Sequence, residues 1–160
     1  MTRQGVRKSL LEQPERPKEI RLNDGSRILV KPFDSLLVAT GGTPNPLPAQ
    51  GADANGVCYF QTFDDTADLL DRITRSQAAV AVGASYIAYE LAEAFSSRGL
   101  DVTWLIRGPH VMHRILDDDG GAVVDAIGRR KGVEFVYRDS ADHVETRDGA
   151  VAAVVTTGGR

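Results

Sequence analysis

The sequence of 160 residues contains one cysteine, Cys58, and no long apolar run. A single cysteine excludes an internal disulfide and a zinc site built from several cysteines, so we expect Cys58 to pack as a small apolar side chain. No apolar stretch approaches the roughly 20 residues that span a bilayer. Residues 1–11 carry basic side chains without the apolar stretch of a secretory signal. We therefore expect a cytoplasmic protein without a membrane partner or a metal site.

Excess charge of either sign is also lacking, because 19 Lys and Arg oppose 22 Asp and Glu for a net charge of −3. This balance argues against a mainly electrostatic nucleic-acid partner. The hydrophobic share of 42% and the charged share of 26% are typical of a globular chain. Glycine is unusually frequent: 16 of the 160 residues are glycine, a larger share than the average of roughly 7%.

The first third of the chain has the pattern of β-structure. Glu19–Leu22 and Arg27–Lys31 alternate around an Asn-Asp-Gly turn signal, which predicts a hairpin. Ser35–Ala39 is a short apolar run and predicts a strand buried on both faces. Residues 43–56 hold three prolines, which predicts a linker or a long crossover.

The rest of the chain alternates helical periodicity with short apolar runs. The expected helices span 63–74, 83–98 and 117–132, the expected strands span 78–82, 101–106 and 133–137, and a final hairpin spans 143–156 with its turn at Asp148-Gly149. We expect Asp64 or Asp65 to open the first helix, and Val123, Val124 and Ile127 to form the buried face of the third. Strands that alternate with helices predict right-handed crossovers and a parallel sheet.

The segment Gly83-Ala84-Ser85-Tyr86-Ile87-Ala88 carries the main chemical signal. It matches the dinucleotide fingerprint G-x-G-x-x-G/A at Gly83, which makes the tight turn, and at Ala88, which allows close helix packing. Ser85 replaces the middle glycine. A strand before the segment and a helix after it supply the context in which free N–H groups bind a pyrophosphate. The alternative is a tight turn that binds no ligand.

The end of the following strand distinguishes NAD from NADP. An acid there would bond the ribose 2′-hydroxyl of NAD, but this chain has Ile106 followed by Arg107. A guanidinium favours a 2′-phosphate, with Arg114 or His113 as a second partner. The pattern therefore favours NADPH over NADH, and the alternative is a solvated arginine at a strand end.

The same turn also resembles the G-x-S-x-G nucleophile elbow of hydrolases, with Ser85 as the nucleophile. Ile87 stands where the elbow needs its last glycine, which argues against this reading. His110, His113 or His143 would have to supply the base.

Together these segments resemble the FAD-dependent pyridine nucleotide–disulfide oxidoreductase superfamily over nearly the whole chain. Leu36–Gly41, followed by Pro44 and Leu47-Pro48, is similar to the A-T-G segment by which these enzymes leave the FAD domain. Residues 51–53, 56–57 and 62–65 resemble the connecting segment of the ferredoxin-reductase and NADH-oxidase branches. Ser85 together with Arg107 looks most like the NADPH-using glutathione, thioredoxin and mercuric reductases.

The resemblance implies an α/β fold in three parts. Residues 1–42 would be the C-terminal part of a split FAD domain, a small β-segment, and residues 43–76 the crossover. Residues 77–160 would form a Rossmann-like, three-layer NAD(P)-binding domain with a parallel sheet and a β-hairpin, truncated before its last strand.

The resemblance also implies roles for individual residues. Tyr86 would gate the place where nicotinamide meets flavin, and Glu90 would pair with a lysine of the FAD domain; these two are the candidate catalytic residues. The candidate cofactor-binding residues are Gly83, Ala84, Ser85, Tyr86, Ile87, Ala88, Arg107, His113, Arg114, Thr40 and Gly41.

No second fingerprint precedes residue 35, and no C-x-x-x-x-C redox pair is present. The resemblance therefore implies one part of a parent oxidoreductase that passes hydride from NADP(H) or NAD(H) to FAD and on to an acceptor. The missing FAD domain would be its partner, and the resemblance allows a homodimeric parent. Alone, the chain should bind dinucleotide weakly and not turn over. The alternative is a non-catalytic or degenerate nucleotide-binding or interaction domain.

Overall fold

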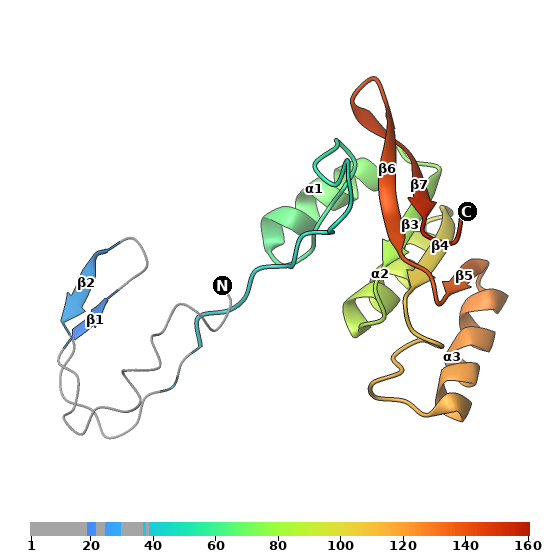
Figure 1. Ribbon diagram of the computed structural model, residues 1–160, viewed down its shortest axis with the longest axis horizontal. Coiled ribbons are helices and arrows are strands. Elements are labelled where there is room, and N and C mark those ends of the chain that lie inside the picture. Colours follow the sequence, from blue (N-terminus) through green and yellow to red (C-terminus); the bar gives the residue numbers. More distant parts are fainter. Residues whose placement is uncertain (1–18, 22–24, 30–36, 38) are drawn as a thin grey trace. The chain divides into compact units, whose positions relative to one another are not determined.

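A computed structural model describes residues 19–21, 25–29, 37 and 39–160 (Figure 1). The chain divides into two units, Met1–Asn45 and Pro46–Arg160. The second unit contains the Gly83 turn that the sequence links to dinucleotide binding.

The described part of the first unit contains one hairpin. Strands β1 (Glu19–Arg21) and β2 (Arg27–Leu29) pair antiparallel, which confirms the prediction, although the predicted turn residues 23–24 lie outside the described residues. Most of the predicted strand at 35–39 also lies outside them. Leu37 is 88% exposed and not in a strand, so its predicted burial is wrong. An apolar run is buried only where other layers cover it, and the described part of this unit shows only the hairpin.

A parallel sheet forms the centre of the second unit. Strands β3 (Ala78–Val82), β4 (Asp101–Ile106) and β5 (Val133–Tyr137) lie in the order β3-β4-β5, as the sequence predicts. Helix α2 (Tyr86–Ser96) joins β3 to β4, and helix α3 (Asp118–Arg130) joins β4 to β5 (Figure 1). Because all three strands are parallel, their carboxyl ends share one edge of the sheet.

Trp104 lies at the centre of the core on β4 and is 1% exposed. Its ring is tilted against Tyr89 of α2, with centroids 6.1 Å apart, and against Phe135 of β5, at 5.4 Å. The small residues Ala81 and Ala88 are buried in the same cluster and let α2 approach the sheet. The core therefore lies between the central strand and the helices.

Helix α3 packs through two glycines and through part of the predicted apolar face, because Val124 contacts the core and Ile127 is partly buried. Gly121 and Gly128 are its buried residues, whereas Val123 is 60% exposed, so that part of the prediction is wrong. Gly121 and Gly128 are seven positions apart, two helical turns, and share one face, while Val123 lies nearly opposite. A Cβ on Gly128 would lie 2.5 Å from Cζ of Phe135. Close packing therefore requires glycine in this helix despite its low helix propensity.

Helix α1 (Phe63–Ile73) begins before the two acidic residues, Asp64 and Asp65, that were predicted to open it. Its N-cap is Thr62, whose hydroxyl accepts from the N–H of Asp65 at 3.2 Å. The Asp65 carboxylate accepts in return from the N–H of Thr62 at 2.7 Å. This reciprocal pair is a capping box, so Asp65 supports the cap but does not form it.

The hairpin consists of β6 (Ala141–Arg147) and β7 (Ala150–Thr156), with the turn between them at the predicted place. Residues 50–55 of the crossover bond to both strands. The N–H of Val144 donates to the carbonyl of Gln50, and the N–H of Val151 donates to that of Asn55, both at 2.8 Å. This segment therefore has a fixed place beside the hairpin.

Two carboxylates fasten the ends of strands. Asp139 follows β5 and accepts from the N–H groups of Ser140 and Gly158, at 2.8 and 2.9 Å. Led by a hydrogen bond from the Thr156 hydroxyl, its contacts lower the pKa of Asp139 to about 2. These contacts join the end of β5 to the end of β7.

The second carboxylate, Asp125 of α3, accepts from the Tyr137 hydroxyl at 2.5 Å and from Nε of Arg129 at 2.7 Å. The Arg129 hydrogen bond lowers the pKa of Asp125. Burial, followed by the bond to Asp125, raises the pKa of Tyr137 well above its ordinary value.

Candidate functional site

Strand β4 binds both the N–H and the carbonyl of Gly83, the first residue of the turn after β3. The N–H of Gly83 donates to the carbonyl of Leu105 at 3.0 Å. The carbonyl of Gly83 accepts from the indole Nε1 of Trp104 at 2.5 Å. Gly83 has a φ of +124°, which residues with a side chain rarely adopt. The sequence pattern and the backbone therefore agree that this position needs glycine.

The N-terminus of α2 opens directly from this turn. Ser85 is the N-cap, but its side chain makes no capping hydrogen bond, and the first turn contains no acidic residue. Helices α1 and α3 differ, because Thr62 caps the first and Asp117 accepts from the N–H of Gly120 at 2.9 Å in the third. The leading N–H groups of α2 thus remain available, and the helix dipole favours an anion there.

The side chains around the turn fall into two groups. Tyr86 is 57% exposed and Ile87 is 47% exposed, and Ser85 and Glu90 are exposed as well. Ala88 is 6% exposed and belongs to the core. Helix α2 therefore packs on the sheet through the side of Ala88 and leaves the side chains of Ser85, Tyr86, Ile87 and Glu90 exposed.

Arg107 is exposed and directly follows β4, so it lies at the same sheet edge as the Gly83 turn. His113 packs against Gly108, where an added Cβ would lie 2.2 Å from Nδ1 of the histidine. That Nδ1 is buried and has no hydrogen-bond partner among the described residues, so it is shielded from a ligand. Arg114 is exposed. Of these three residues, Arg107 is the one that is exposed directly at the sheet edge of the Gly83 turn, where a phosphate could contact it.

The described residues do not form the pair of nucleophile and base that a hydrolase would need at Ser85. Nδ1 of His110 lies 2.9 Å from the carbonyl oxygen of Val111, and its Nε2 lies 3.2 Å from Asp118. Nδ1 of His143 lies 2.9 Å from the carboxylate of its neighbour Asp142. In the described part of the chain, no hydrogen bond joins the Ser85 hydroxyl to a histidine.

Thr40 and Gly41 belong to the first unit, where both are exposed. Their role toward FAD stays a prediction. Among the described residues, no group of three or more His, Cys, Asp or Glu side chains could hold a metal ion. No helix of that part of the chain has the length and apolar character to cross a membrane.

Residues 10–160 match the family model described as pyridine nucleotide-disulphide oxidoreductase. The chain belongs to this family. The match confirms the resemblance inferred from the Gly83 turn and the A-T-G segment. Relatives include a rubredoxin-NAD(+) reductase of Pseudomonas putida, 28% identical over 79% of this chain and 33% of the relative. A nitrite reductase [NAD(P)H] of Bacillus subtilis is 29% identical over 77% of this chain and 15% of the relative. The chain therefore spans a third or less of these relatives.

Solved structures of several reductases and oxidases share the fold. A ferredoxin reductase from Rhodopseudomonas palustris superposes with a TM-score of 0.80 at 24% identity, covering 89% of this chain and 35% of that one. The putidaredoxin reductase of a covalent complex with putidaredoxin gives a TM-score of 0.76 at 26% identity, with the same coverage. A water-forming NADH oxidase from Lactobacillus brevis, bound to NADH, gives 0.72 at 23% identity over 88% of this chain and 31% of that one. The predicted α/β fold with a parallel sheet and a hairpin is confirmed.

Sequence reasoning missed the contribution of Trp104. The residue stands in an apolar strand, and nothing in its neighbours indicates a bond to the glycine turn. The register between β3 and β4, with Ala81 opposite Trp104, brings the two together. An aromatic N–H in the strand next to a fingerprint turn is the one signal that could have suggested the contact.

Proposed function

We propose that the chain is the NAD(P)H-binding part of an FAD-dependent oxidoreductase that passes hydride from NADPH, in preference to NADH, to flavin and then to an acceptor. The observation that carries the proposal is the Gly83 turn, which β4 holds at both backbone groups and which opens onto the uncapped N-terminus of α2. FAD, when bound to the parent, would supply the redox chemistry.

The residues of this chain bind and orient the dinucleotide. Backbone N–H groups from Ala84 to Ala88 would hold the pyrophosphate, helped by the dipole of α2. Tyr86, exposed at the start of the helix, would cover the place where the nicotinamide meets the flavin. Glu90, exposed one turn further on, would pair with a lysine of the FAD domain.

The preference for NADPH rests on Arg107. An exposed guanidinium at the carboxyl end of β4, with no acid in that strand end, suits a 2′-phosphate better than a 2′-hydroxyl. Arg114, which is exposed, would be the second partner, and Nδ1 of His113 is buried against Gly108 and would not reach the phosphate. Solved structures of this fold include a water-forming oxidase bound to NADH and an engineered variant of that same oxidase bound to NADPH, so the fold can hold either cofactor.

Titration of the chain with NADPH and NADH by calorimetry tests the proposal. We expect saturable binding of both, with NADPH tighter. Arg107→Ala should weaken NADPH binding about tenfold and leave NADH unchanged, because an arginine–phosphate contact is a charge-assisted hydrogen bond. Arg147→Ala, an exposed arginine on β6, removes the same charge away from the turn and should change neither.

Two outcomes would contradict different parts of the proposal. A folded chain that binds neither dinucleotide refutes the binding function and leaves the non-catalytic domain as the explanation. Tighter binding of NADH than of NADPH refutes only the role of Arg107. The same proposal includes an FAD domain and an electron acceptor in the parent, and a homodimeric parent located in the cytoplasm. It also includes the inactivity of the isolated chain and the domain limits at residues 42 and 76.

A further inference from the structure

We propose that Trp104 is a positioning residue for the dinucleotide turn: its indole N–H fixes the Gly83–Ala84 peptide so that the N–H of Ala84 faces the bound pyrophosphate. The inference rests on the proposed function and adds a residue outside the fingerprint. The observation that carries it is the 2.5 Å bond from Trp104 Nε1 to the carbonyl of Gly83.

The geometry of the peptide bond links the two groups. In a planar trans peptide, the carbonyl of Gly83 and the N–H of Ala84 point in opposite directions. A carbonyl directed at the Trp104 indole therefore turns the N–H of Ala84 away from that indole. This N–H would then join the free donors at the N-terminus of α2.

Glycine makes such a restraint necessary. With its φ of +124° and no Cβ contact within 4 Å, Gly83 has room to rotate. If the peptide flipped, it would present a carbonyl oxygen to the phosphates in place of an N–H donor. The bond from the Gly83 N–H to Leu105 fixes one side of this residue, and the bond from Trp104 fixes the other.

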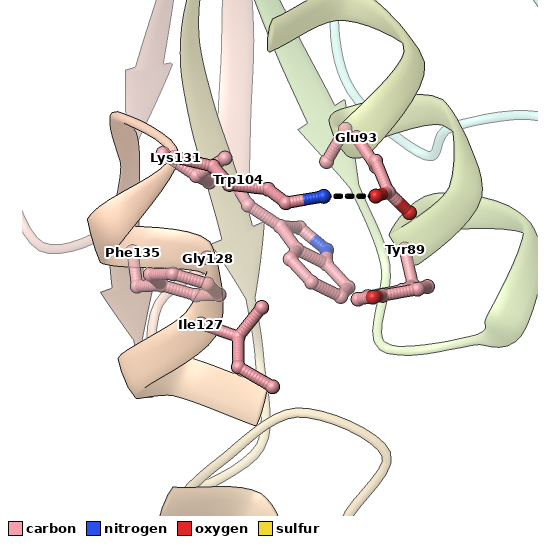
Figure 2. Close-up of a pocket in the computed structure, with 9 residues that line it drawn as sticks. Tyr89, Glu93, Trp104, Ile127, Gly128, Lys131 and Phe135 are labelled. Atoms are coloured by element: carbon pink, nitrogen blue, oxygen red, sulfur yellow. Dashed lines mark hydrogen bonds and ion pairs between the residues drawn. The ribbon is translucent and has the colours of Figure 1, made fainter. Parts of the chain in front are cut away.

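The indole itself has little freedom to follow the carbonyl. Figure 2 shows Trp104 between Tyr89 of α2 and Phe135 of β5. The ion pair between Lys131 and Glu93 joins α2 and α3 beside it. Burial of an N–H without a partner is costly, so the indole and the Gly83 carbonyl stabilise each other's position. An apolar side chain at this position could fill the space but could not donate.

The experiment uses the fact that Trp104 is the only tryptophan of the chain. The full chain, labelled with ¹⁵N, gives one indole N–H signal, and we expect its hydrogen exchange to be slow. Trp104→Phe keeps an aromatic ring but removes the donor, and a benzothienylalanine at position 104 keeps the shape as well. Phe95→Leu, at the far end of α2 and 7% exposed, is the matched core control.

Both Trp104 replacements should shift and broaden the Ala84 amide signal and raise the dissociation constant for NADPH about fivefold, the effect of one lost hydrogen bond. Phe95→Leu should lower stability but leave the Ala84 signal and the dissociation constant within twofold of the original. An unchanged Ala84 signal in both replacements, or equal weakening in Phe95→Leu, overturns the inference. If the unmodified chain binds no dinucleotide, the proposed function fails, while the Ala84 signal still decides whether Trp104 positions the peptide.

Discussion

Replacement of Gly128 by alanine tests whether close packing governs helix α3. In an ordinary helix this change stabilises a protein by about 1 kcal/mol. Here the new Cβ would lie 2.5 and 2.8 Å from two carbons of the Phe135 ring. That ring cannot retreat easily, because it stacks on Tyr137 at 5.6 Å and lies under the Arg129 guanidinium at 5.2 Å. Overpacking costs about 1–3 kcal/mol, which offsets the gain of about 1 kcal/mol, so we expect a net loss of up to about 2 kcal/mol.

Urea unfolding of the full chain measures the effect. The single variants Gly128→Ala and Phe135→Leu and their double variant form a thermodynamic cycle. With leucine at 135 the clash is relieved, so Gly128→Ala should then be neutral or stabilising by about 1 kcal/mol. Ala126→Gly, at an exposed position of the same helix, gives the local helix-propensity scale.

The reasoning is refuted if Gly128→Ala stabilises the chain by about the Ala126 reference value. It is also refuted if the effect of Gly128→Ala is the same with phenylalanine and leucine at position 135, because the two residues would then be uncoupled.

Three further predictions concern single contacts. The pKa of Asp139 is lowered to about 2 from 3.8. Its carboxylate therefore contributes to stability above pH 3.8, and this contribution is lost as the pH falls toward 2. Acid unfolding of Asp139→Asn should lack the loss of stability between these two pH values. Among the four tyrosines, Tyr137 should ionise late in an absorbance titration because burial and Asp125 raise its pKa; a late phase that persists in Tyr137→Phe would contradict the assignment. Thr62→Ala should lower the free energy of unfolding by about 1 kcal/mol, and a loss no larger than that of Thr66→Ala, in the same helix, would count against the capping box.

Local pattern was sufficient to predict the strands and helices of the second unit. Ala78–Val82 and Asp101–Ile106 are strands with the predicted bounds, because short apolar runs between turn signals depend mainly on nearest neighbours. The burial of Leu37, Val123 and Cys58 was mispredicted, because all three side chains are exposed. Burial depends on which distant segments cover a residue, and a local pattern of residues does not show that.

The site shows the same division. Gly83 and the uncapped helix after it follow from a local pattern that backbone geometry requires. The hydrogen bond from Trp104 to the Gly83 carbonyl depends on the register between β3 and β4, and it joins residues 21 positions apart. Sequence spacing alone gave no means of pairing the two residues. The individual roles of Arg107, Tyr86 and Glu90 stay predictions.

The bonds between residues 50–55 and the hairpin set a practical limit on how far the chain can be shortened. A chain begun at Ala78 would keep every strand of the sheet and both of its connecting helices, yet it would leave the N–H groups of Val144 and Val151 without the carbonyls of Gln50 and Asn55. Unpaired strand donors are templates for pairing with another molecule. A truncation at Pro46 retains this built-in protection against aggregation, whereas one at Ala78 removes it.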